Sequence, residues 1–321
     1  MTEHFVRPDV AQFLAFLNNF PGPKTHEMAP PAARAAYAAM KDIADPPIGD
    51  LAVTKDTVAP GPAGDIPLRL FDCRADRGAG PVVVFFHGGG FVIGDLDTHA
   101  SFCAEASRVL DLPVVAVDYR LAPENPFPAA PDDCEAAARY VANGPADVGL
   151  SPTGLILMGD SAGGALTIVT AMALRDQPAA VPVIAQFPIY PTVDAAEDYA
   201  SFALFNEGRL LTKDAMTWFE AAYAADPEHW RGRPINGAHH DMPPTLILTA
   251  GLDPLRDQGR SYAAALIAHG VPTIFREAAG NIHGLITLRK AIPSSADDVA
   301  GALAALKLMI AERTEQRGAA A

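Results

Sequence analysis

Short apolar runs alternate with helix-type stretches along most of the chain. From about residue 66 onward, the apolar runs are rich in β-branched residues and are apolar at every position rather than at every second one. Strands of this kind are typical of a mainly parallel sheet that helices cover on both faces. The runs fall at 81–86, 112–117, 154–158, 183–187 and 244–249, and the helix-type stretches fall near 100–110, 132–143, 162–175, 257–269 and 296–312. The alternation predicts an α/β fold with a mostly parallel central sheet flanked by helices. Two earlier runs, 51–57 and 67–73, predict an antiparallel hairpin at one sheet edge.

Two segments do not follow this alternation. Residues 1–48 carry apolar side chains at helical spacing and then an alanine-rich helix. Residues 192–238 form a long insertion between two strands, with aromatic residues such as Phe202 and Phe205 in helix-type surroundings. Segments inserted after strand ends lie over the carboxyl edge of such sheets, where ligands bind. We therefore expect 1–48 and 192–238 to form one helical cap, and 49–191 and 239–321 to form the two parts of a single catalytic core.

The charge balance restricts the partners. The chain of 321 residues has 24 lysines and arginines against 38 aspartates and glutamates, a net charge of −14. An acidic surface disfavours nucleic acid and anionic membranes, so we expect a small-molecule substrate, with the protein a monomer or a homodimer. The first residues lack the pattern of a signal peptide, and no apolar run approaches the roughly 20 residues that cross a bilayer. Three widely spaced cysteines, Cys73, Cys103 and Cys134, are typical of free thiols in a reducing cytoplasm.

Gly159-Asp160-Ser161-Ala162-Gly163 follows an apolar strand and precedes a helix. Glycines two positions before and after the serine allow a sharp turn, which exposes the Ser161 hydroxyl beside a helix N-terminus. The alternative is an ordinary glycine-rich turn, but the strand before it and the helix after it favour a nucleophile at Ser161.

A second glycine-rich segment, His87-Gly88-Gly89-Gly90, ends the apolar run at 81–86. We expect the backbone N–H groups of Gly88 and Gly89 to stabilise an oxyanion together with that of Ala162, the residue after the nucleophile. Phosphate binding is the other common use of such loops, but the chain shows neither of the usual nucleotide-binding glycine patterns.

Serine needs a base and a carboxylate that orients the base. His283 lies in a loop after a strand-like run near the end of the core, and Asp253 stands just past the strand at 244–249. Asp257 is the alternative acid, although its place in the first turn of the next helix favours a capping role. The resulting order of Ser161, Asp253 and His283 differs from that of the chymotrypsin-like and subtilisin-like enzymes.

The other histidines favour less specific roles. We interpret His87 as shaping the glycine loop and His99 as structural. His229, His239, His240 and His269 lie in loops, in the insertion or at a helix end. The adjacent His239-His240-Asp241 suggests a metal, but no further ligand follows at a metal-site spacing, so we expect none.

Five motifs in register resemble the bacterial hormone-sensitive lipase family of esterases, in its GDSAG subgroup. They are His87-Gly88-Gly89-Gly90-Phe91, Tyr119-Arg120-Leu121-Ala122-Pro123-Glu124, Gly159-Asp160-Ser161-Ala162-Gly163-Gly164, Asp253-Pro254-Leu255-Arg256-Asp257 and His283-Gly284. The resemblance implies an α/β-hydrolase fold with a helical cap, and hydrolysis of carboxylic esters without a cofactor. It implies catalysis by Ser161, Asp253 and His283, with Gly88, Gly89 and Ala162 as the oxyanion hole. Leu285 stands where the family usually has phenylalanine, which bears on the shape of the pocket rather than on catalysis.

The expected reaction is hydrolysis of short to medium acyl esters through an acyl-enzyme. An amidase or deacetylase would use the same triad, and a small-molecule receptor is known on a related fold. A receptor would lack part of the triad, whereas this chain has all three residues. Epoxide hydrolases and dehalogenases on this fold place aspartate where Ser161 stands, which excludes them.

Overall fold

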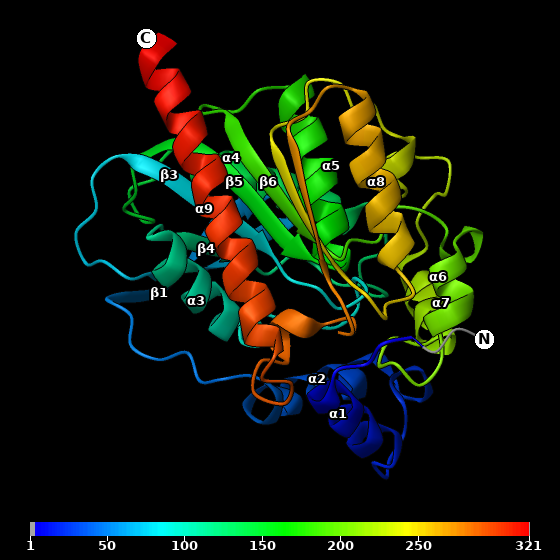
Figure 1. Cartoon of the computed structure of the whole chain (residues 1–321). Coiled ribbons are helices and arrows are strands. Elements are labelled where there is room, and N and C mark those ends of the chain that lie inside the picture. Colours follow the sequence, from blue (N-terminus) through cyan, green and yellow to red (C-terminus); the bar gives the residue numbers. More distant parts are fainter. Residues whose placement is uncertain (1–3, 321) are drawn as a thin grey trace.

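One eight-stranded sheet forms the centre of the structure, a computed structural model that describes residues 4–320 (Figure 1). The strand order is β1-β2-β4-β3-β5-β6-β7-β8. The first three strands in this order pair antiparallel, and all later pairs are parallel. The strands are β1 (Val53–Gly61), β2 (Gly64–Asp72), β3 (Gly80–Phe86), β4 (Val114–Val117), β5 (Pro152–Asp160), β6 (Val183–Ile189), β7 (Thr245–Ala250) and β8 (Thr273–Ala278). The predicted mostly parallel sheet and its antiparallel edge hairpin are confirmed.

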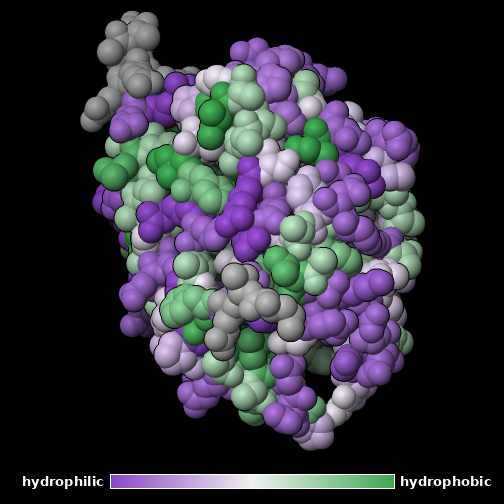
Figure 2. Space-filling view, turned by 45° about the vertical axis from the view of Figure 1, so that its right-hand side comes forward, coloured by the Kyte–Doolittle hydropathy of each residue, from purple (hydrophilic) through white to green (hydrophobic). Residues whose placement is uncertain are grey.

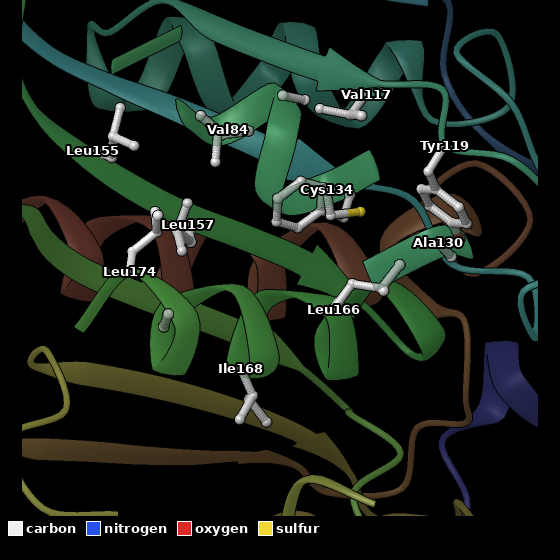
Figure 3. Close-up of a cluster of buried hydrophobic side chains, with 14 of the residues drawn as sticks. Val84, Val117, Tyr119, Ala130, Cys134, Leu155, Leu157, Leu166, Ile168 and Leu174 are labelled. Atoms are coloured by element: carbon white, nitrogen blue, oxygen red, sulfur yellow. The ribbon is translucent and has the colours of Figure 1, made fainter. Parts of the chain in front are cut away.

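Helices cover both faces of this sheet. Helices α3 (Ala100–Leu110) and α9 (Ser295–Ala320) pack on one face. Helices α4 (Ala129–Ala142), α5 (Ala162–Asp176) and α8 (Arg256–Ala268) pack on the other face. Figure 3 shows part of the core beneath α4, α5 and α8, to which Leu155 and Leu157 of β5, Leu166 of α5 and Cys134 of α4 contribute.

The two cores explain why the strands are apolar throughout. Val82, Val84 and Phe86 of β3 belong to the core beneath α4, α5 and α8, whereas Val83 and Phe85 belong to the core beneath α3 and α9. All five side chains are at most 1% exposed. Because successive residues of a strand point to opposite faces, a strand that is covered on both sides must be apolar at every position.

The segments outside the alternation lie together at one end of the sheet (Figure 1). They contain α1 (Pro8–Asn18), α2 (Pro30–Ala44), α6 (Ala200–Phe205) and α7 (Lys213–Tyr223), with short 3₁₀ turns Thr25–Glu27, Ala196–Asp198, Pro234–Asn236 and, in the core, Leu285–Thr287. Val10, Phe13 and Leu14 of α1 bury their side chains in one cluster with Phe205 of α6 and Ile282. The predicted segments 1–48 and 239–321 include residues 1–3 and 321, which lie outside the residues that the structure describes.

Polar and apolar side chains are interspersed on the face that Figure 2 shows. Between residues 4 and 320, no helix combines the length and the apolar character that a membrane span requires.

Candidate active site

Ser161 sits on a strained turn between β5 and α5. Its backbone angles, φ 55° and ψ −117°, lie in a region that residues other than glycine rarely occupy. The turn is held from both sides, because the Ser161 N–H donates to the carbonyl of Ile189 at 2.8 Å and its carbonyl accepts from the N–H of Ala165 at 3.1 Å. These bonds fix a conformation that presents the hydroxyl group beyond the strand end.

The glycines around Ser161 are required by close backbone approach. A Cβ on Gly159 would collide with the carbonyl oxygens of Gly163 and Phe86, and a Cβ on Gly163 would collide with that of Phe86. The end of β3 therefore passes directly against the turn, which brings the His87–Gly90 segment beside Ser161.

The structure brings Ser161, His283 and Asp253 together. His283 Nε2 lies 2.9 Å from Ser161 Oγ, and His283 Nδ1 lies 2.7 Å from Asp253 Oδ2. Asp253 is fully buried, and its Oδ1 accepts from the N–H of Leu255 at 2.8 Å. The carboxylate thus has a donor at each oxygen and holds the imidazole with Nε2 directed at the hydroxyl.

Asp257 does not reach the imidazole. Its carboxylate accepts from the N–H of Ser201 at 3.0 Å and contacts Arg256 and Arg260. Burial acts to raise the pKa of Asp257, but these arginines and the Ser201 N–H outweigh it, so the pKa lies below its usual value. Asp257 anchors the start of α6, and of the two carboxylates only that of Asp253 contacts the imidazole of His283.

The loop that carries His283 is tied to the N-terminal segment. Arg7 donates to the Ala279 carbonyl at 2.8 Å and to both carboxylate oxygens of Asp298 at 2.6 and 2.9 Å. Asp298 also accepts from the Asn281 side chain at 2.9 Å, two residues before His283. The Asn281 carbonyl accepts from the N–H of Leu252, the neighbour of Asp253. This network fixes the base loop and the acid loop relative to each other.

Asp160, next to the nucleophile, is a site residue that the sequence analysis missed. It is 4% exposed, and its Oδ1 accepts from the N–H of Gly88 at 2.7 Å and lies 3.2 Å from His99 Nε2. Its Oδ2 accepts from the Tyr190 hydroxyl at 3.3 Å. Burial acts to raise the pKa of Asp160, but His99 and the Gly88 N–H outweigh it and lower the pKa below its usual value. An acidic residue at the end of an otherwise apolar strand is the signal that would have pointed to this role.

The hydrogen bond between the Gly88 N–H and Asp160 changes the set of N–H groups that are free to stabilise an oxyanion. The N–H of Gly88 is taken by the Asp160 carboxylate, so Gly88 is not free to stabilise an oxyanion as the sequence analysis expected. The N–H groups of Gly89 and Gly90 have no acceptor among residues 4–320. Both glycines have positive φ, 119° and 58°, which turns the backbone away from the strand direction. Ala162 is the first residue of α5, so its N–H also lacks a partner within the helix.

His87 and His99 contact the residues that hold the glycine-rich segment His87–Gly90 in place. His87 Nδ1 lies 2.8 Å from the Gly88 carbonyl, and its ring stacks on Tyr119 at a centroid distance of 4.3 Å. Burial, with His99 nearby, lowers the pKa of His87 to about 4, so the ring is neutral at pH 7. His99 Nδ1 lies 3.0 Å from the Thr98 hydroxyl. Both rings therefore pack against the residues that hold the glycine loop.

Segments that the sequence analysis assigned to a cap contact the site directly. A Cβ on Gly90 would collide with the ring of Phe219 from α7, so this ring lies against the glycine loop. A Cβ on Gly284, next to His283, would lie 3.4 Å from Leu210 Cδ2. Arg34 of α2 donates to the Val92 carbonyl at 2.8 Å. Phe202 and Phe205 of the same insertion pack within buried apolar clusters.

The His239-His240-Asp241 run does not converge. His239 Nε2 lies 3.2 Å from the Ile235 carbonyl, whereas His240 Nδ1 lies 3.1 Å from Asp241 Oδ2 at the surface. No group of three or more metal-ligating side chains occurs in the part of the chain that the structure describes.

Residues 83–287 match a family model described as the α/β hydrolase fold. The chain is similar to the carboxylic ester hydrolase LipN of Mycobacterium tuberculosis, with 40% identity over 243 residues that cover 73% of this chain and 64% of LipN, slightly less than two thirds of that protein. It is similar to the carboxylesterase NlhH of the same species, with 35% identity over 318 residues that cover 96% of this chain and 98% of NlhH. Among solved structures, ester-hydrolase EH1AB1 from the metagenome of Lake Arreo, complexed with a derivative of bipyridine phosphonate, has a TM-score of 0.88 at 33% identity and covers 96% of this chain and 99% of its own.

Proposed function

The chain belongs to the α/β-hydrolase fold family, and from this premise we propose that it cleaves carboxylic esters through a triad of Ser161, His283 and Asp253. Relatives that match it over nearly its whole length are carboxylesterases, and this chain is a carboxylesterase as well. The observation that carries the proposal is the unbroken hydrogen-bond chain from Asp253 through His283 to Ser161.

In the first step, the Ser161 oxygen attacks the carbonyl carbon of the ester while His283 Nε2 takes the hydroxyl proton. Nε2 lies 2.9 Å from Ser161 Oγ, which is within the reach that a general base needs. The buried Asp253 carboxylate holds the proton on Nδ1, so that Nε2 stays free to act as the base, and it stabilises the imidazolium that forms.

The carbonyl oxygen becomes an oxyanion in this step. The N–H groups of Gly89, Gly90 and Ala162 would stabilise it. Gly89 and Gly90 lie in the loop after β3 that passes beside Ser161, Ala162 directly follows Ser161, and none of the three N–H groups has an acceptor within the described chain. Removal of one such donor from a comparable site costs about 10²–10³ in kcat. Collapse of the intermediate transfers the proton from Nε2 to the leaving alcohol and leaves Ser161 acylated. Water that His283 deprotonates then releases the acid and the free enzyme.

We further propose that the preferred acyl chains are short to medium. The segments 1–48 and 192–238 act as the cap in this proposal, because Phe219 lies on the oxyanion loop and Leu210 beside His283. A pocket closed in this way gains roughly 0.8 kcal/mol for each methylene that it buries. Activity should therefore rise with acyl length up to about four to eight carbons and fall once the chain meets the ring of Phe219.

The test is kcat/KM on p-nitrophenyl esters from acetate to palmitate. The proposal predicts a maximum at intermediate length, which Phe219→Ala moves to longer chains. A steady rise through palmitate with activation at an oil–water interface would contradict the closed pocket. Rates on an ester and an amide with the same acyl group separate the esterase from an amidase, and the proposal expects the ester to react faster.

The three cysteines support a reducing compartment. Cys103 and Cys134 are buried, Cys73 is partly buried, and all three are free thiols. Disulfides persist in oxidising compartments and are rare in the cytoplasm. We therefore include a cytoplasmic location in the proposal, which fractionation of cells that express the protein tests.

A further inference from the structure

Arg209 is a partly buried cation that lacks a carboxylate partner among the side chains of residues 4–314, which the structure describes. It lies in the segment 206–212 between α6 and α7, and its guanidinium packs over the ring of Phe205 at 5.4 Å. Its Nη1 atom is inaccessible to solvent and has no hydrogen-bond partner within the described part of the chain. Burial alone accounts for a lowered pKa at Arg209, with no carboxylate nearby to raise it. The group still stays charged at neutral pH, because arginine does not lose its proton in proteins.

Other arginines in the same regions are paired. Arg7 binds Asp298, Arg289 binds Asp45 at 2.7 Å, and Arg233 of the insertion lies 3.6 Å from Asp194. A chain with 38 acidic residues has many carboxylates to offer, and each of these cations has one. An unpaired buried charge lowers stability unless an external partner supplies the missing acceptor.

The segment that carries Arg209 borders the proposed triad. Phe205, beneath the guanidinium, packs in one apolar cluster with Leu252 and Ile282, the neighbours of Asp253 and His283. Leu210, the next residue, lies beside Gly284 on the other side of His283. The side of the site near the imidazole receives the leaving alcohol, because Nε2 delivers the proton to that group.

We propose that Arg209 binds a carboxylate on the alcohol portion of the substrate, and so selects esters whose leaving group is anionic. This inference rests on the proposed function, because it needs an alcohol that leaves on the side of His283. A carboxylate accepts two parallel hydrogen bonds from a guanidinium, and a rotation of the partly exposed Arg209 side chain toward the substrate would give Nη1 the acceptor that it lacks. The cation–π contact with Phe205 holds the guanidinium in place before the substrate arrives.

The experiment compares aryl acetates that differ in charge and little in shape. The anionic substrates are 4-acetoxybenzoate, 4-acetoxyphenylacetate and 3-(4-acetoxyphenyl)propanoate, which place the carboxylate at increasing distances, and each has its primary amide as the neutral match. For each pair, kcat/KM is measured with the wild type, Arg209→Gln, Arg209→Lys and the control Arg233→Gln. For each pair, the ratio of kcat/KM for the anionic ester to kcat/KM for its neutral match is calculated. Dividing this ratio in a variant by the same ratio in the wild type cancels the intrinsic difference in reactivity between the two leaving groups.

Arg209→Gln should lower the anionic-to-neutral ratio by about 10- to 100-fold for at least one pair, the usual effect of one hydrogen bond between charged groups. Arg209→Lys should retain part of the preference, and Arg233→Gln should leave the ratio within twofold. Turnover of the neutral amides shows that each variant is folded, and wild-type activity on them tests the proposed function separately. A ratio that Arg209→Gln leaves unchanged for all three pairs would overturn the inference.

A free anion from solution is the alternative partner for the Arg209 guanidinium. If Arg209 held one, acetate at constant ionic strength would change wild-type turnover of the neutral amides and leave that of Arg209→Gln unaffected. That result would overturn the assignment to the substrate. The inference expects acetate to have no effect on neutral substrates.

Discussion

Replacement of Asp160 should impair catalysis although this side chain does not touch the reacting atoms. Its carboxylate joins the nucleophile turn to the glycine loop through the bond from the Gly88 N–H. Asp160→Ala removes this acceptor and leaves the Gly88 N–H and His99 Nε2 without it. Asp160→Asn keeps the shape and one acceptor oxygen but loses the charge.

The structure sets the size of the effect. A buried donor left without a partner costs about 1–3 kcal/mol, so in Asp160→Ala the loop should shift until Gly88 finds another acceptor. Gly89 and Gly90 follow Gly88 directly and would move with it. Displacement of one oxyanion donor corresponds to a loss of about 10²–10³ in kcat. For Asp160→Ala we expect a loss of this size in kcat. For Asp160→Asn we expect kcat to fall only about tenfold, because the amide oxygen still accepts a neutral hydrogen bond of about 1 kcal/mol from the Gly88 N–H.

The assay separates this positioning effect from a general loss of stability. Steady-state kinetics on p-nitrophenyl butyrate should show a lower kcat with KM little changed, because the oxyanion forms only in the transition state. A trifluoromethyl ketone, which forms an oxyanion when the serine adds to it, should bind more weakly in proportion to the loss of kcat. Urea unfolding verifies that each variant is folded under the assay conditions, and Asp257→Asn is the matched control.

The account of Asp160 is wrong if folded Asp160→Ala retains kcat within about twofold, or if its kcat falls while affinity for the ketone is unchanged. Either result would mean that the oxyanion donors keep their positions without the carboxylate.

The remaining predictions concern the acid, the buried histidine and metals. Asp253→Asn should lower kcat by about 10⁴, as a wrong tautomer does in a serine protease, and Asp257→Asn by far less; the reverse ranking in steady-state kinetics would move the orienting role to Asp257. The pKa of His87 is lowered to about 4 by burial, so the unfolded chain binds the extra proton below about pH 6.5. The free energy of unfolding should then fall by about 3 kcal/mol between pH 6.5 and 4, and urea titrations should show this contribution missing in His87→Asn. Because the proposed steps use only side chains and backbone groups, dialysis against a chelator should leave kcat/KM unchanged, and a loss that zinc restores would contradict the mechanism.

The sequence predicted the fold well because its strands are buried on both faces. Val82 to Phe86 are all apolar, short in extent and rich in β-branched residues, a pattern typical of a strand that is covered on both faces, and the two antiparallel runs before them form the edge hairpin. The elbow at Ser161 could also be predicted, since its glycines report a close backbone approach. The structure places Asp253, His283 and Ser161 in hydrogen-bond contact, as the sequence analysis expected for a triad.

What escaped prediction depends on contacts between distant residues. Three successive glycines look alike in sequence, and only the bond to Asp160 shows that the N–H of Gly88 is already used. The aromatic residues of the insertion are likewise equivalent in pattern, yet Phe219 reaches the glycine loop while Phe205 packs in an apolar cluster. Side-chain direction on short helices in an irregular segment is set by tertiary packing, which hydrophobic periodicity does not report.

Covalent labelling tests the central claim most directly. The protein is treated with a p-nitrophenyl alkylphosphonate, and peptide mass spectrometry locates the adduct. The account predicts loss of ester hydrolysis with one phosphonyl group on the peptide that contains Ser161, and neither labelling nor turnover in folded Ser161→Ala. An adduct on a different serine, or hydrolysis that survives in Ser161→Ala, would contradict it.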